Sequence, residues 1–209
     1  MLKSLLAALV LGLGAAPAMA ATLTITASGV VDSAAPGVGA EVGDNFTLTA
    51  TVAEPAFFEF DDPPFLSQTD YRLETLTAQI GPATLSLIAP TNAASLRISV
   101  IDSFSTVRVF LNPGTFTSSA NAFFGNFVAR WTFDEAVGSS FADLDALDFA
   151  SATQSAFSAA DSRTQGSGVA GTITAESFTL PAPIPLPAAG WLLLAGLGGL
   201  GLARRRRHA

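Results

Sequence analysis

Between residues 21 and 180, hydrophobic and polar residues alternate in short runs, which is the pattern of β-strands with one buried face. Residues 22–27 and 46–52 show it most clearly, because threonine occupies every second position in both. Glycine, proline and aspartate separate the runs, and no long amphipathic helix interrupts them. The predicted strands are residues 22–27, 46–52, 72–80, 84–88, 96–101, 107–111, 127–133 and 171–180.

This succession of short strands predicts an all-β domain over residues 21–180, an antiparallel β-sandwich of the jelly-roll kind. Such a length is enough for one domain with a substantial core. Residues 143–149 are expected to form a helical turn or loop whose apolar side chains cover one end of that core. Trp131 alternates with Phe133 on a predicted strand, so we expect its indole in the core rather than on a binding surface.

The first twenty residues have the three parts of a secretory signal peptide. Lys3 provides a basic start, residues 5–16 are apolar, and Ala18 and Ala20 form the small-x-small pattern that signal peptidase recognises. The alternative is a retained N-terminal anchor, but about twelve apolar residues are short for a spanning helix. We therefore expect residues 1–20 to be removed on export.

The C-terminal end resembles a membrane anchor on a stalk. Alternating prolines make residues 181–187 an extended segment that cannot join a sheet interior. Residues 188–203 are apolar and glycine-rich, and as a transmembrane helix they would be about 24 Å long, close to the ~30 Å of a bilayer core. Residues 204–209 form a basic tail that the positive-inside rule places in the cytoplasm. Its membrane-stop cluster is Arg204, Arg205, Arg206 and Arg207, which argues against a buried helix.

Pro185, Leu186, Pro187 and Ala188, followed by the apolar segment and the arginines, resemble the VPLPA-type C-terminal sorting signal, a variant of the PEP-CTERM signals of exported proteins in Gram-negative bacteria. Ile184 stands where that signal usually has valine. The resemblance implies recognition by an exosortase-type membrane protease and cleavage near the proline motif. It also implies a transient inner-membrane intermediate and delivery to the cell surface or extracellular matrix.

Residues 28–49 and 169–174 are also similar to the glycine-punctuated strands of ectodomains that accompany such signals. The leading hypothesis is therefore an exported, non-catalytic surface or matrix protein associated with extracellular polysaccharide. Two alternatives remain open at this point: an adhesion module that binds carbohydrate or calcium, and a secreted hydrolase. A hydrolase of glycosides would need two carboxylates across a cleft, and the sequence supplies many carboxylates without identifying such a pair.

Charge and composition restrict the possible partners. All 17 acidic residues lie between residues 32 and 176, where only five arginines oppose them, so this part carries a net charge of −12. Such a body is expected to repel nucleic acid and other anionic polymers. Cysteine is absent and the single histidine, His208, lies in the tail, which excludes thiol chemistry and the most common general base from the domain.

One acidic segment is a weak candidate for a metal or sugar site. Residues 54–64 are interpreted as a loop in which carboxylates surround phenylalanines, a combination suited to a sugar face or a calcium ion. The spacing matches no known calcium loop, and residues 143–148 carry only half of such a pattern. No cofactor is expected beyond this possible calcium ion. The candidate ligands are Glu59, Asp61 and Asp62.

Overall fold

The computed structural model describes residues 21–62, 66–101, 104–112, 114–119, 124–161 and 168–181. This part of the chain is almost entirely β-structure, with two short helical segments late in the sequence. The elements are β1 (Thr22–Ala34), β2 (Asn45–Asp62), β3 (Leu66–Ile80), β4 (Ala83–Leu87), β5 (Ala94–Ile101), β6 (Phe104–Leu111), β7 (Phe116–Ser118), β8 (Phe124–Phe133), α2 (Phe141–Asp145), η1 (Phe149–Ser151), β9 (Gln154–Asp161) and β10 (Gly168–Thr179).

Eight of the strands form a closed ring. Their hydrogen-bonded order is β2–β1–β10–β9–β8–β6–β5–β3, and β3 pairs with β2 to complete the circle. Every pair is antiparallel. The prediction of an open sandwich is therefore wrong: the domain is a closed eight-stranded antiparallel β-barrel. Strands β4 and β7 continue from β3 outside the ring.

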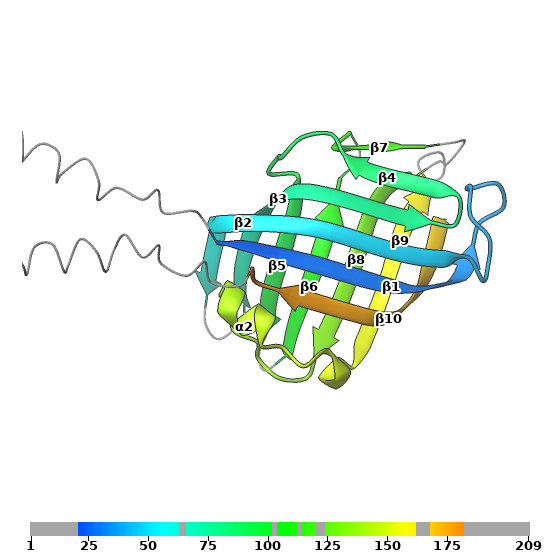
Figure 1. Ribbon diagram of the computed structural model, residues 1–209. Coiled ribbons are helices and arrows are strands. Elements are labelled where there is room, and N and C mark those ends of the chain that lie inside the picture. The colour runs from blue at the N-terminus through cyan, green and yellow to red at the C-terminus, as the bar shows by residue number, and fades with distance from the viewer. Residues whose placement is uncertain are drawn as a thin grey trace, which may run out of the picture.

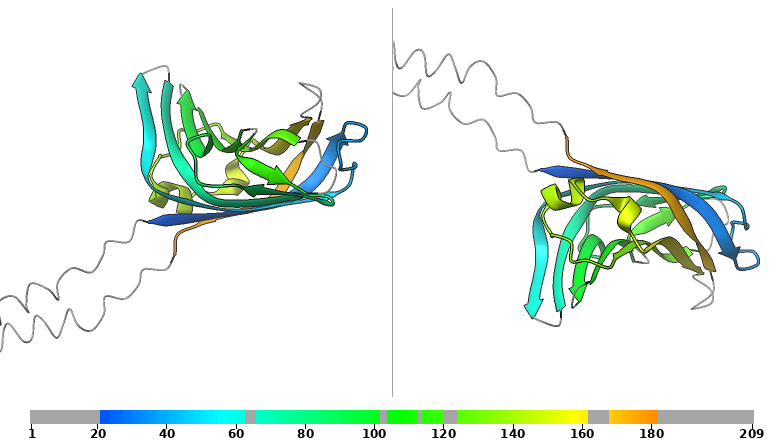
Figure 2. Two further views of the ribbon diagram at one scale, coloured as in Figure 1. Left: turned by 90° about the horizontal axis from the view of Figure 1, so that it is seen from above. Right: turned by 90° about the horizontal axis from the view of Figure 1, so that it is seen from below.

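Two long strands close the barrel. β2 has 18 residues and β3 has 15, and they pair with each other on both sides of a register shift between Ala53 and Phe58. β3 pairs with β5 in its first part and with β4 in its second part. Figure 1 shows β1, β2, β3 and β10 crossing in front of β5, β6, β8 and β9, and Figure 2 shows the second half of β2 turning away from the front layer. The sequence prediction failed because it interpreted residues 54–64 as a loop and so ended β2 before the part that joins the two layers.

The predicted strands are otherwise confirmed, since each of the eight runs lies within or overlaps an observed strand. β7 and β9 were missed. β7 has only three residues, and β9 reads Gln-Ser-Ala-Phe-Ser-Ala-Ala-Asp, whose small residues have little intrinsic strand preference. The predicted helical turn exists as α2 and η1.

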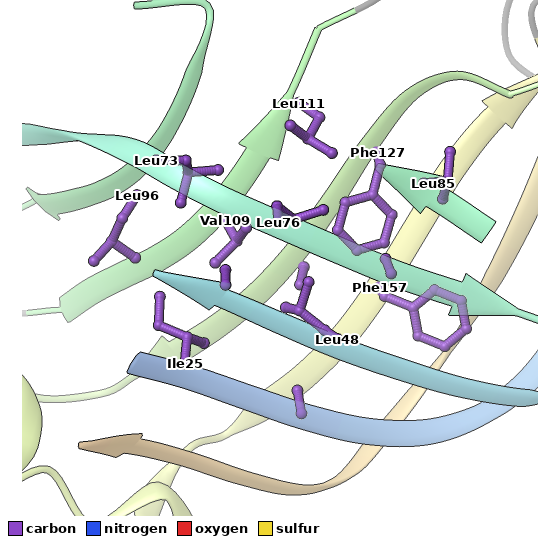
Figure 3. Packing of buried hydrophobic residues seen from close by; sticks show 14 of the residues in the cluster. Ile25, Leu48, Leu73, Leu76, Leu85, Leu96, Val109, Leu111, Phe127 and Phe157 are labelled. Carbon is purple, nitrogen blue, oxygen red and sulfur yellow. The ribbon is translucent and has the colours of Figure 1, made fainter. Parts of the chain in front are cut away.

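The barrel interior is filled by side chains from every wall (Figure 3). Trp131 and Phe127 of β8 are fully buried, which confirms the prediction for the tryptophan. Phe46 of β2 stacks on Phe157 of β9 with 4.0 Å between ring centroids, so the aromatic core connects the two layers. Because the chain has no cysteine, this packing stabilises the described fold without disulfides.

Helices α2 and η1 cover the barrel where β9 and β10 separate. The β9–β10 pairing ends at Thr172, although β10 continues to Thr179. Phe149 of η1 stacks on Phe178 of β10 with 4.6 Å between ring centroids, and it lies edge-to-face with Trp131 at a centroid distance of 5.9 Å. The helical segment therefore completes the core beside the last strand, as Figure 1 shows for α2.

The predicted targeting segments lie outside the described residues. These include the signal peptide with Ala18 and Ala20, the sorting motif at 185–188, the proposed transmembrane helix at 188–203 and the arginine cluster at 204–207. Within the described part, no helix is both long and apolar enough to span a membrane. Thr24 of β1 pairs with Thr179 of β10, so the described chain begins and ends at the same end of the barrel (Figure 1).

Candidate functional site

Three arginines lie side by side on the outer surface of the barrel. Arg97 of β5 pairs with Arg108 of β6, and Arg108 pairs with Arg130 of β8. Each arginine has buried residues on both sides along its strand, so all three side chains point away from the core. Neighbouring strands are about 4.8 Å apart, which brings three like charges into one short row.

Arg72 of β3 belongs to the same surface. It lies two residues from Asp70, which pairs with Arg97, and alternation along the strand places both on the outer face. Its guanidinium donates from Nε and Nη2 to Asn92 Oδ1 at 3.0 and 2.6 Å. All four arginines in the described part of the chain are therefore on one face, which we call the arginine face (Arg72, Arg97, Arg108 and Arg130).

One arginine of this face is neutralised. Arg97 donates to both carboxylate oxygens of Asp70, from Nε at 2.8 Å and from Nη2 at 2.7 Å. The Asp70 side chain is 4% exposed and that of Arg97 is 36% exposed. This two-pronged hydrogen bonding raises the pKa of Arg97 above its ordinary value. It is the only ion pair among the described residues.

Arg108, in the middle of the row, has no anionic partner among the described residues. Its Nε is buried and makes no hydrogen bond. Burial lowers the pKa of Arg108, and repulsion from Arg97 and Arg130 lowers it further. The group still stays charged, because an arginine starts far above neutral pH. An incoming carboxylate at the surface would compensate the excess positive charge of the row.

A groove runs over this part of the surface beside Arg108 and Arg130. It has a volume of about 570 Å³ and opens between β6, β8, β9, β10 and β1. Arg130 Nη2 donates to Gln154 Oε1 at 2.6 Å, and the Thr172 hydroxyl donates to Asp32 Oδ2 at 2.6 Å. The remaining lining is mainly small and apolar, as suits contact with a sugar ring: Val128, Ala156, Ala170 and Gly171.

An exposed apolar edge borders the arginine face at the end of the hairpins. Phe58 of β2 pairs with Asp70 of β3, which in turn pairs with Arg97 at the end of the arginine row, and Phe60 is two residues further along β2. Ile101 and Phe104 pair with each other on β5 and β6. All four are between 38% and 43% exposed, so they are large apolar groups that the fold leaves in contact with water.

The acidic candidates of β2 are not brought together. They lie on a strand rather than in a loop, where Glu59, Asp61 and Asp62 pair with Thr69, Ser67 and Leu66. Strand alternation directs Glu59 and Asp61 to one face and Asp62 to the other, together with Phe58 and Phe60, so the three carboxylates do not converge on one site. Among the described residues, no group of three acidic or histidine side chains could hold a metal ion.

The aspartates of the helical segment have local structural contacts. Asp143 accepts the Ser140 backbone N–H at 3.1 Å, and Ser140 Oγ accepts the Asp143 N–H at 3.2 Å, which forms a capping box. Asp145 Oδ1 accepts the backbone N–H of Leu180 at 2.7 Å, and Asp148 Oδ1 accepts that of Ala150 at 3.0 Å. These contacts account for an acidic pattern that looked like half a calcium loop.

The fold and this surface together define an antiparallel β-barrel with a cationic outer face on an acidic body. Neither the scan of family models nor the searches of curated proteins and of solved structures found a match. The arginine face was missed at the sequence level because its residues are far apart in the chain. A usable signal existed: Arg97, Arg108 and Arg130 each interrupt an apolar strand at a solvent-facing position.

Proposed function

We propose that this chain is an exported, non-catalytic surface or matrix protein whose arginine face binds an acidic polysaccharide. The observation that carries the proposal is the collection of four arginines on one face of a body with a net charge of −12. Unpaired like charges on neighbouring strands repel each other, and an anionic ligand would relieve that repulsion.

The chemistry of the face favours carboxylates on a polymer. A guanidinium binds a carboxylate through two parallel hydrogen bonds, as Arg97 already does with Asp70. Arg108 and Arg130 have no anionic partner in the described part. The groove beside them adds the amide of Gln154 and a small apolar floor, and such a mixture suits a sugar that has hydroxyl groups and C–H faces.

The overall negative charge does not prevent this binding. Charges are screened over about 8 Å at physiological salt, so a ligand in contact with the row responds mainly to the nearest groups. The row contains three arginines and one aspartate, and Asp32 adds a second carboxylate at the margin of the groove. The expectation from composition, that anionic polymers are repelled, describes approach from a distance rather than contact.

Export and sorting are supported by the two ends of the sequence. The signal-peptide pattern ends at Ala20, and the motif at 185–188 precedes the apolar segment and the arginine cluster. The intact mass of the surface protein tests this part, and a chain that still ends in Arg-Arg-Arg-Arg-His-Ala would contradict processing. Replacing residues 185–188 by alanine and serine should leave the protein in the inner membrane.

Binding is tested with a soluble polyuronate, titrated against the full-length chain at several salt concentrations. The double variant Arg108→Gln with Arg130→Gln should lose most of the affinity. Arg130→Lys is the matched control, because it keeps the charge but lacks the planar fork, and it should bind with intermediate affinity. Unchanged binding by the double variant, or equal binding of a neutral glucan by the parent, would contradict the proposal.

A further inference from the structure

The outer surface of the other layer is a regular array of hydroxyl-bearing side chains. In the central part of β1, β2 and β3 the outward positions hold threonine, serine or glutamine, with Val30 of β1 and Glu74 of β3 at the margin, and the array extends onto neighbouring strands. Each member is exposed or half-buried. We call it the threonine face, and it comprises Thr24, Thr26, Ser28, Thr47, Thr49, Thr51, Thr75, Thr77, Gln79, Ser86, Thr117, Ser177 and Thr179.

The strand register aligns these residues in straight rows across the layer. One row has a threonine on each of four adjacent strands, β10, β1, β2 and β3. The next row crosses six strands, from β10 to β7, with only threonine and serine. Members are about 4.8 Å apart along a row, and successive rows are about 6.8 Å apart along the strands. Figure 2 shows these strands edge-on as one layer that curves away at both ends.

The side chains of this array are held in position. Threonine is branched at Cβ, which restricts rotation about its first side-chain bond. Neighbouring hydroxyls are also hydrogen-bonded across strands: Thr51 Oγ1 lies 2.7 Å from Thr75 Oγ1, and Thr26 Oγ1 lies 3.1 Å from Ser177 Oγ. The surface therefore presents fixed methyl and hydroxyl groups with two repeat distances.

Strand preference alone does not account for this composition. Threonine favours strands, but exposed strand faces also carry lysine, glutamate and arginine, which oppose aggregation. On the same barrel, the arginine face has charged and aromatic side chains at its outward positions. The threonine face has neither a charged nor an aromatic member. This uniform composition is found in one layer of the barrel only. It is suited to a partner that is itself uncharged and regular.

We propose that the threonine face binds the surface of ice crystals. Charge complementarity favours a neutral partner, because the central rows of the face have no charged member although the body around them carries −12. An array with repeats in two directions matches a partner that repeats in two directions. Methyl groups restrict the orientation of the water next to them, and fixed hydroxyls replace lattice water as donors and acceptors, so the face orders water in an ice-like layer.

Other occupants fit this face less well. A neutral polysaccharide surface is usually bound through aromatic rings that cover the C–H faces of sugars, and the threonine face has none. A second copy of the chain would need apolar area, whereas this face consists of hydroxyl-bearing side chains with one amide. The proposal is independent of acidic-polysaccharide binding, since it uses the opposite layer of the barrel.

The test is partition into growing ice. Full-length protein is mixed with a slowly freezing solution, and its concentration in the ice fraction is compared with that in the remaining liquid. The parent should be enriched in ice and should slow the recrystallisation of small crystals. Thr49→Lys, at the centre of the array, should be excluded from ice like an ordinary solute, and Thr49→Ser, which removes only the methyl group, should be intermediate.

Thr106→Lys is the matched control, because it introduces the same charge at an outward position of β6, far from the array. It should enter ice as the parent does. Circular dichroism confirms that each variant is folded, and Thr77→Lys is used if Thr49→Lys is not. The inference is overturned if the parent is excluded from ice, or if the lysine variants at 49 and 77 enter as well as it does. Sedimentation with crystalline cellulose that depends on Thr49 would instead assign a polysaccharide surface to this face.

Discussion

The ion pair between Asp70 and Arg97 provides a quantitative test of the arginine face. The two partners are unequally buried, since the carboxylate side chain is 4% exposed and the guanidinium side chain is 36% exposed. Removing one partner therefore has different consequences from removing the other. Asp70→Ala leaves a guanidinium that water can reach, whereas Arg97→Ala leaves a carboxylate that water reaches poorly.

The expected magnitudes follow from this asymmetry. A buried pair that loses one partner costs about 3–5 kcal/mol, whereas a fully exposed pair is worth about 0–1 kcal/mol. For Arg97→Ala we expect a loss of about 3 kcal/mol, because the remaining charge is buried. For Asp70→Ala we expect about 2 kcal/mol, mainly from two lost charged hydrogen bonds that water partly replaces. The double variant should lose less than the sum of the single losses, because it leaves no unpaired charge.

Urea unfolding at pH 7, followed by tryptophan fluorescence, measures the three free energies. Asp70→Ala should also bind polyuronate more tightly than the parent at low salt, because Arg97 is released to the row. Stability and affinity thus change in opposite directions. The reasoning is refuted if Asp70→Ala destabilises more than Arg97→Ala, if the single losses simply add, or if the affinity for polyuronate falls.

Three further predictions concern the barrel. Gly171→Ala should lower the free energy of unfolding by about 2 kcal/mol, because its Cβ would lie 2.1 Å from the backbone carbonyl oxygen of Val30 and 2.5 Å from the Phe157 ring. The additional change Phe157→Leu should not restore stability, because the clash with the backbone remains; unfolding midpoints measure both variants. Burial raises the pKa of Glu176, so the fold is favoured while this carboxyl group is protonated and loses stability as the group ionises with rising pH. Glu176→Gln, which cannot ionise, should therefore raise the unfolding midpoint at pH 7 but not at pH 3. Ser140→Ala should cost about 1 kcal/mol by removing the cap that includes Asp143, measured by the same urea titration.

The sequence by itself determined the class of the domain and most of its strands. Alternation with period two depends only on which side of a strand is buried, and it located every strand except β7 and β9. Burial of Trp131 followed from the same pattern. The targeting signals remain predictions, which rest on local sequence patterns outside the described residues.

Only the tertiary structure decided how the strands close and which side chains meet. Alternation is identical in a sandwich and in a barrel, and the difference arises from β2 and β3, which continue past a register shift and pair with each other in both layers. The two outer faces follow from that closure. Arg97, Arg108 and Arg130 become neighbours through strand register, and so do the threonines of β1, β2 and β3. Register depends on pairing between distant segments, and therefore no local pattern in the chain encodes it.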